Sequence, residues 1–178
     1  KAAADPAWRD MPGEQRAALI YALAQRIHAH AEELVYLESI SSGGTVSRIA
    51  GLDLPAALDI CWTTAEIVRA YPFVENLPPR PLPELTHAQV IKEPIGVCGL
   101  ITPWNFPLAL FLAKVIPALA AGNAVVAKPS ELTPHTAARF AEITADLLPP
   151  GVLNIVHGYG HEVGSAMSEH PGIGKISF

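Results

Sequence analysis

The sequence predicts an α/β protein in which N-terminal helices precede a parallel β-sheet. Apolar residues recur at near-helical spacing through the first part of the chain, whereas short β-branched runs alternate with helix-length segments through the last part. Between the two parts, Pro72 to Pro83 holds five prolines, which exclude a helix or a central strand. We therefore expect an extended linker there.

Two helices are expected before the linker. A long amphipathic helix should run from Glu14 to Ile40, with charged residues between its apolar positions. After a serine and glycine break, a second helix should run from about Pro55 to Ala70, with Leu58, Trp62 and Ile67 among its apolar positions. The two helices should pack against each other.

Beyond the linker, we expect one separate strand and then a series of βαβ units. The separate strand, His87 to Glu93, alternates apolar and polar residues and could lie outside the main sheet. The strands expected in the main sheet are Ile95 to Thr102, Ala124 to Lys128, Leu153 to Val156 and Ile173 to Phe178. The helices expected between them are Pro107 to Ala121, Pro134 to Leu147 and His161 to Ser168. Thr133 is the expected N-cap of the second of these helices, because proline is favoured at the first helical position.

Composition excludes several classes of function. The 178 residues are 50% hydrophobic, so the chain is long enough and apolar enough to bury a sizeable core. Its formal net charge is −5, and it offers no basic face that would bind nucleic acid. Cys61 and Cys98 lie far apart in apolar surroundings, which predicts neither a disulfide nor a metal site and fits a reducing, cytoplasmic compartment.

A membrane or export role is not expected either. No basic and then apolar leader opens the chain. Pro94 to Ala113 is uncharged over a length that could span a bilayer, but Pro103 and Pro107 interrupt it. A buried strand, a turn and a helix account for this segment better.

Parallel strands joined by helices place ligands at the carboxyl ends of the strands. Three junctions are therefore of interest: Thr102 to Pro107, Lys128 to Glu131 and His157 to Gly164. In the first, two prolines fix the direction of Trp104 and Asn105. The Asn105 amide could donate to an oxyanion, but asparagine is also a favoured helix cap, and the residues alone leave both interpretations open.

The other two junctions suit a nucleotide. Lys128 and Glu131 set a cation and a carboxylate close together on a turn, where they could hold a ribose or form a solvated surface ion pair. Gly158 and Gly160, with Gly164 beyond them, resemble a loosened glycine fingerprint, although glycines also serve ordinary turns.

Taken together, these segments resemble the aldehyde dehydrogenase family. The family pattern runs through Gly-Val-x-Gly-x-Ile-x-Pro-Trp-Asn-Phe-Pro, a lysine, Pro-Ala-Leu-Ala-x-Gly-Asn and Lys-Pro-Ser-Glu. This sequence matches it at residues 96–107, at Lys114, and at residues 117–123 and 128–131. The resemblance implies a Rossmann-like sheet, of which this chain holds only a part.

The resemblance also implies a chemistry. A cysteine thiolate would attack an aldehyde to form a thiohemiacetal, hydride would pass to NAD, with NADP as the alternative, and a glutamate-activated water would release the acid. Asn105 would polarise the carbonyl oxygen, and Lys114 would support the Asn105 region from the following helix. Residues of all three junctions would bind the cofactor: Ile101, Thr102, Pro103, Trp104, Asn105, Lys128, Ser130, Glu131, Gly158 and Gly160.

On this resemblance, residues 1–83 form a helical segment with its linker, residues 84–94 a strand of the type used in oligomers, and residues 95–178 a partial dinucleotide-binding domain. The partners would be a small aldehyde and further copies of the protein, in a homodimer or homotetramer. Ala113 stands where the family often has tryptophan, and neither the nucleophilic cysteine nor the general-base glutamate falls within these residues. A short non-catalytic homologue and a CoA-acylating enzyme are therefore the alternatives.

Overall fold

The parallel sheet lies at the centre of the molecule, with helices on both of its faces. The computed structural model describes residues 1–81 and 83–178. Four parallel strands have the order β5-β4-β3-β6. They are β3 (Val97–Ile101), β4 (Ala124–Lys128), β5 (Leu153–Ile155) and β6 (Lys175–Ser177). All four coincide with expected strands, so the α/β class predicted from the sequence is confirmed.

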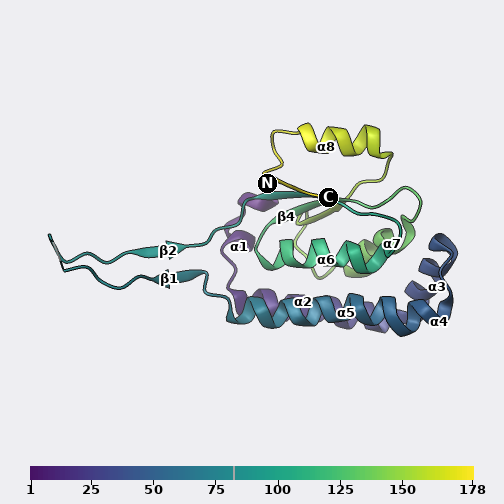
Figure 1. The fold of residues 1–178 in the computed structure, drawn as a ribbon, viewed down its shortest axis with the longest axis horizontal. Helices are drawn as coiled ribbons and strands as arrows, with labels where there is room; N and C mark the ends of the chain where they lie inside the picture. The colour runs from purple at the N-terminus through teal and green to yellow at the C-terminus, as the bar shows by residue number, and fades with distance from the viewer. Residues whose placement is uncertain (82) are drawn as a thin grey trace.

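Helices connect the strands and form layers above and below the sheet. The connecting elements are α6 (Pro107–Ala120), α7 (His135–Thr144), the π-helical turn η3 (Gly160–Gly164) and α8 (Ser165–Glu169). Figure 1 shows α8 over one face of the sheet and α6 and α7 over the other. The sheet and α6 meet in a fully buried core that includes Phe111, Val115 and Val125.

Two long N-terminal helices, α2 (Gly13–Ala29) and α5 (Leu54–Ala70), form a further layer beyond α6 (Figure 1). The other N-terminal elements are η1 (Ala2–Ala4), α1 (Pro6–Arg9), α3 (Ala31–Ser42), α4 (Val46–Arg48) and the π-helical turn η2 (Ile49–Asp53). As expected, α2 and α5 pack against each other. Small buried residues of α5, Ala57, Cys61 and Ala65, allow this close approach.

One expectation about the N-terminal helices is wrong. The helix predicted from Glu14 to Ile40 is broken at His30, which has φ −107° and ψ 21° and separates α2 from α3. The break lets α3 pack on α7, where Arg139 Nε lies 2.9 Å from Glu33 Oε1. Trp62 and Ile67 are 44% and 58% exposed, because the small residues of α5 occupy its buried face instead.

The segment expected to be a linker contains a strand. β1 (Val74–Asn76) pairs antiparallel with β2 (Gln89–Ile91) in a separate two-stranded sheet. The ladder forms because Pro72 and Pro78 fall just outside it and remove no ladder donor. This hairpin extends away from the rest of the molecule (Figure 1). One residue of the expected linker, Leu82, lies outside the described residues.

The start of α7 also differs from expectation. Pro134 occupies the N-cap position, and no side chain caps the helix. The Thr133 hydroxyl is buried and has no hydrogen-bond partner within residues 1–81 and 83–178. Thr133 is therefore not the cap, because Pro134 occupies that position and the Thr133 hydroxyl is buried without a partner among the described residues.

Candidate functional site

The first junction connects β3 to α6. Ile101 is half-buried and Thr102 is buried, whereas Pro103, Trp104 and Asn105 are exposed. The Thr102 N–H donates to the Lys128 carbonyl oxygen at 3.1 Å, which joins this junction to the end of β4. The rigid turn therefore begins inside the sheet and presents its next three side chains to solvent.

Asn105 does not cap the helix that follows it. Phe106 occupies the N-cap position of α6 and makes no side-chain capping bond. The Leu108 N–H in the first turn donates instead to Glu38 Oε2 of α3, at 3.0 Å. The capping interpretation of Asn105 is therefore wrong, and its amide is left exposed beside the carboxyl edge of the sheet.

The second junction holds a buried cation. Lys128 is only 2% exposed, and its Nζ donates to Glu131 Oε2 at 3.0 Å and to the Pro129 carbonyl at 3.1 Å. The Glu131 side chain is 38% exposed, so part of its carboxylate faces solvent. The interpretation as a solvated surface ion pair is wrong, because the lysine is enclosed by protein.

Ser130 shapes this turn and helps to hold Glu131 in place. Its Oγ accepts a hydrogen bond from the Leu132 N–H at 3.2 Å, and its carbonyl accepts one from the Thr133 N–H, also at 3.2 Å. The pKa of Glu131 is lowered by its own backbone N–H first, then by Lys128, and further by the Gly160 N–H. The third junction thus lies next to the second, and the carboxylate between them is held ionised.

The third junction follows β5. Gly158 has φ 150°, and a side chain at this position would collide with Val163. Gly160 opens η3 and has open space where a Cβ would lie. A side chain is therefore sterically excluded at Gly158 but not at Gly160, where the backbone lies open beside Glu131.

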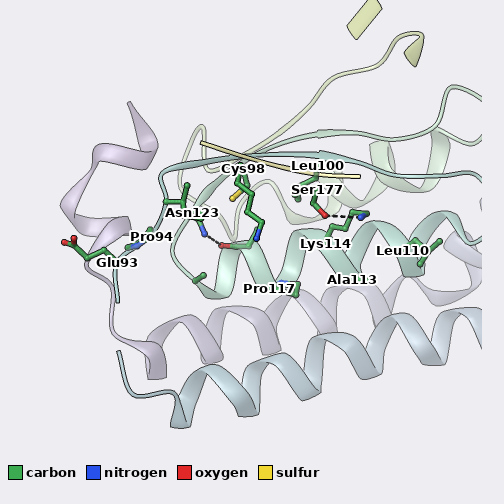
Figure 2. A pocket seen from close by; sticks show the side chains of 14 residues that line it. Glu93, Pro94, Cys98, Leu100, Leu110, Ala113, Lys114, Pro117, Asn123 and Ser177 are labelled. Atoms are coloured by element: carbon green, nitrogen blue, oxygen red, sulfur yellow. Dashed lines mark hydrogen bonds between the residues drawn. The ribbon is translucent and has the colours of Figure 1, made fainter. Parts of the chain in front are cut away.

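Lys114 is half-buried in α6. It projects from α6 into a cavity of about 500 Å³, where its Nζ donates to Ser177 Oγ of β6 at 3.0 Å. Figure 2 shows this bond between helix and sheet, with Cys98 nearby. Within the described residues, no side-chain hydrogen bond joins Lys114 to Asn105. Lys114 therefore joins α6 to the end of β6.

The two cysteines have the properties of core residues. Cys61 is fully buried in α5, and burial raises its pKa to about 12. Cys98 is 3% exposed in β3, and burial raises its pKa, while Lys175 lowers it. Neither thiol is ready to act as a nucleophile, because nucleophilic attack needs an accessible thiolate.

Sequence reasoning missed the side chains that support the first junction from the N-terminal helices. Besides Glu38, they are Arg48, whose guanidinium lies 4.6 Å from the centroid of the Phe106 ring, and Asp53, whose Oδ2 forms an ion pair with Arg48 Nη2 at 3.1 Å. A signal for Glu38 was available. It lies three and four residues after Val35 and Leu34, on the buried face of α3, where an acidic residue needs a partner.

A parallel sheet with polar junctions at its carboxyl edge is the arrangement of nucleotide-binding α/β proteins. The sequence model of the aldehyde dehydrogenase family matches residues 1–178. The chain belongs to the aldehyde dehydrogenase family.

Individual relatives agree with this assignment. The chain is 42% identical to fluoroacetaldehyde dehydrogenase of Streptantibioticus cattleyicolor, with 99% of this chain and 34% of that protein aligned. It is 42% identical to the NADP/NAD-dependent aldehyde dehydrogenase PuuC of Escherichia coli, with 96% of this chain and 34% of that protein aligned. The chain spans about a third of the length of these relatives.

Solved structures show the same fold. A variant of aldehyde dehydrogenase C from Pseudomonas syringae, in complex with NAD+ and octanal, superimposes with a TM-score of 0.88. It is 40% identical, and the alignment covers 98% of this chain and 35% of that one. In the described part of the present chain, no helix is both long and apolar enough to cross a membrane.

Proposed function

We propose that the protein containing this chain oxidises an aldehyde to a carboxylic acid with NAD, and that this chain binds the adenosine end of the cofactor. The observation that carries the proposal is the pair of Lys128 and Glu131. A buried ammonium holds a partly exposed carboxylate in one place at the end of β4. An oriented carboxylate at such a strand end suits the hydroxyl groups of a ribose.

The described residues fit such a cofactor. The ionised Glu131 carboxylate accepts hydrogen bonds, the buried Lys128 ammonium fixes its position, and the open backbone at Gly160 lets a flat group approach. Bound nicotinamide would supply the acceptor for hydride. Ile101 to Trp104 would form the neighbouring wall of the groove, since they lie at the carboxyl end of the adjacent strand β3.

Asn105 would act on the substrate. Its exposed amide can donate to a carbonyl oxygen and stabilise the negative charge that develops when a nucleophile attacks. Cys61 and Cys98 are unsuited to that attack, so the nucleophile is expected in the remainder of the protein. Replacing Asn105 by Ala should lower kcat about 100-fold or more while leaving the KM for NAD nearly unchanged.

The preference for NAD over NADP tests the proposed role of Glu131 in binding the ribose. In the whole protein, Glu131→Gln should narrow any preference for NAD over NADP, because a carboxylate near the ribose repels a 2′-phosphate. We expect about a tenfold change in the ratio of kcat/KM values, taking about 1.4 kcal/mol for a screened contact between like charges.

Glu142→Gln is the matched control, because Glu142 is exposed on α7 and pairs with Arg139 away from the junctions. It should leave the ratio unchanged. An NAD/NADP ratio that is the same in Glu131→Gln and in the native protein would contradict the assigned role. Absence of aldehyde oxidation in the native protein would contradict the proposed function itself.

The cytoplasmic location and the homodimer or homotetramer remain predictions from the sequence. β2 is positioned to take part in an assembly, since it belongs to a hairpin outside the main sheet and carries the exposed side chains of Val90 and Ile91. Size-exclusion chromatography with light scattering on the whole protein would give the oligomeric state.

A further inference from the structure

Glu38 connects the N-terminal helices to the loop that carries Asn105. It is 2% exposed in α3, and its Oε2 accepts the Leu108 N–H in the first turn of α6. This carboxylate replaces a local cap, since α6 has none of its own. It also places negative charge at the positive end of the α6 dipole. The contact spans 70 residues of sequence.

A second contact holds the same loop. The Arg48 guanidinium lies over the Phe106 ring, 4.6 Å from its centroid, and Asp53 Oδ2 lies 3.1 Å from Arg48 Nη2. Asp53 is 3% exposed and therefore limits the directions that Arg48 can take. Phe106 directly follows Asn105, and Leu108 comes two residues later. Side chains of the N-terminal helices thus hold the chain at two points just beyond the amide.

The groups around Glu38 permit this contact over a range of pH. The pKa of Glu38 is raised to about 7, chiefly by burial and to a lesser extent by Asp53, against the opposing effects of the Leu108 N–H, Arg48 and the Thr136 hydroxyl. Oε1 has no hydrogen-bond partner of ordinary geometry among the described residues. A protonated carboxyl still offers an acceptor oxygen, so the bond to Leu108 needs an oxygen at this place more than it needs a charge.

We propose that Glu38 is a positioning residue for the reaction, which fixes the direction of the Asn105 amide by capping α6 from α3 while Arg48 holds Phe106. The inference rests on the proposed role of Asn105. Substrate does not touch Glu38, so its effect must pass through the loop. A displacement of about 1 Å at a reacting centre can cost about 100-fold in rate, and partial loosening should cost less.

The test is a double-mutant cycle in the whole protein. Glu38→Leu removes the acceptor, Glu38→Gln keeps an oxygen, and each is made with native Asn105 and with Asn105→Ala. With native Asn105, Glu38→Leu should lower kcat about tenfold and keep the KM for NAD within about twofold of the native value. Glu38→Gln should recover most of the lost kcat. With Ala at 105, the Leu substitution should change kcat by less than about twofold, because no amide is left to position.

Three kinetic outcomes would overturn the inference. They are an equal loss of kcat from Glu38→Leu with and without the Asn105 amide, a loss confined to the KM for NAD, and a Gln variant as impaired as the Leu variant. Glu32→Leu is the matched control, since Glu32 is an exposed acidic residue on the same helix. It should leave kcat unchanged.

Hydrogen exchange provides a readout that needs no turnover. Amides of residues 104–110 should exchange about tenfold faster in Glu38→Leu than in the native protein, and at the native rate in Glu38→Gln and Glu32→Leu. Unchanged exchange in Glu38→Leu would overturn the inference even if the native protein oxidised no aldehyde. If the Leu variant fails to fold, Arg48→Lys serves in its place. It keeps a charge for Asp53 but loses the planar group over Phe106, and it should lower kcat about threefold without affecting the KM for NAD.

Discussion

Replacing Glu38 by Gln should change the way stability depends on pH. Burial raises the pKa of this carboxyl from 4.5 to about 7. Below about pH 4.5, the group is protonated in both the folded and the unfolded chain. As the pH rises, the unfolded chain releases its proton first, so the native protein loses stability until about pH 7, where the loss is complete. The difference between the two pKa values corresponds to about 3 kcal/mol.

Gln cannot titrate, so the comparison isolates this effect. From about pH 5 to about pH 8, the Gln variant should gain thermal stability relative to the native whole protein. The gain should reach several degrees, since a domain of about 150–250 residues shifts by about 2–4 °C for each kcal/mol. Scanning calorimetry at several pH values would measure it, with the scan rate held constant because large proteins often unfold irreversibly.

Asp146→Asn is the control for this prediction. Asp146 is exposed, and its hydrogen bond with Arg26 lowers its pKa, so it is ionised in the folded and unfolded chains across this interval. Its variant should differ from the native protein by a constant amount. If the difference between Glu38→Gln and native protein is also constant, or falls as the pH rises, then burial does not dominate the titration of Glu38 and the reasoning is refuted.

Three further predictions concern other parts of the chain. Gly158→Ala should weaken NAD binding and cost about 1–3 kcal/mol, because Gly158 has φ 150° and a Cβ there would meet Val163; Gly51→Ala, with open space at that position, is the control for calorimetry and NAD titration. Phe140→Ala should cost about 3–5 kcal/mol by chemical denaturation, since the ring is fully buried, and a cost below about 1 kcal/mol would show that the site collapses. Cys61 should resist iodoacetamide at about pH 8 until the protein is denatured, because burial raises its pKa to about 12; rapid labelling of the native protein, read by mass spectrometry, would contradict its burial.

The sheet and its three junctions could be predicted because their signals are local. β-branched runs are separated by glycine and proline breaks, and each run contains one strand, although only the run Ala124–Lys128 matches its strand at both ends. Once parallel strands are inferred, the carboxyl-edge rule places Asn105, Glu131 and Gly160 together without further information. The Glu131 carboxylate does lie beside the Gly160 N–H, which helps to lower its pKa.

The remainder depends on contacts between distant segments. The periodicity of residues 14–40 continues across His30, so only the docking of α3 on α7 shows where the helix must turn. β1 was hidden by the prolines around it, because its three residues pair only with a segment further along the chain. The burial of Lys128 could not be predicted from the sequence either, since a lysine after a strand is usually solvated.

If Asn105 has the role proposed above, the contact between Glu38 and α6 explains why its amide is free to act on a substrate. An asparagine at the start of a helix ordinarily gives its side chain to the helix, where a cap contributes about 1 kcal/mol. In this protein the Glu38 carboxylate of α3 accepts a hydrogen bond from the Leu108 N–H at 3.0 Å, so the Asn105 amide is not needed as a cap. An amide that stabilises a developing oxyanion contributes about 3–4 kcal/mol to the barrier. Glu38, a buried residue far away in the sequence, therefore caps α6. The Asn105 amide stays exposed at the edge of the sheet, where the proposed substrate can reach it.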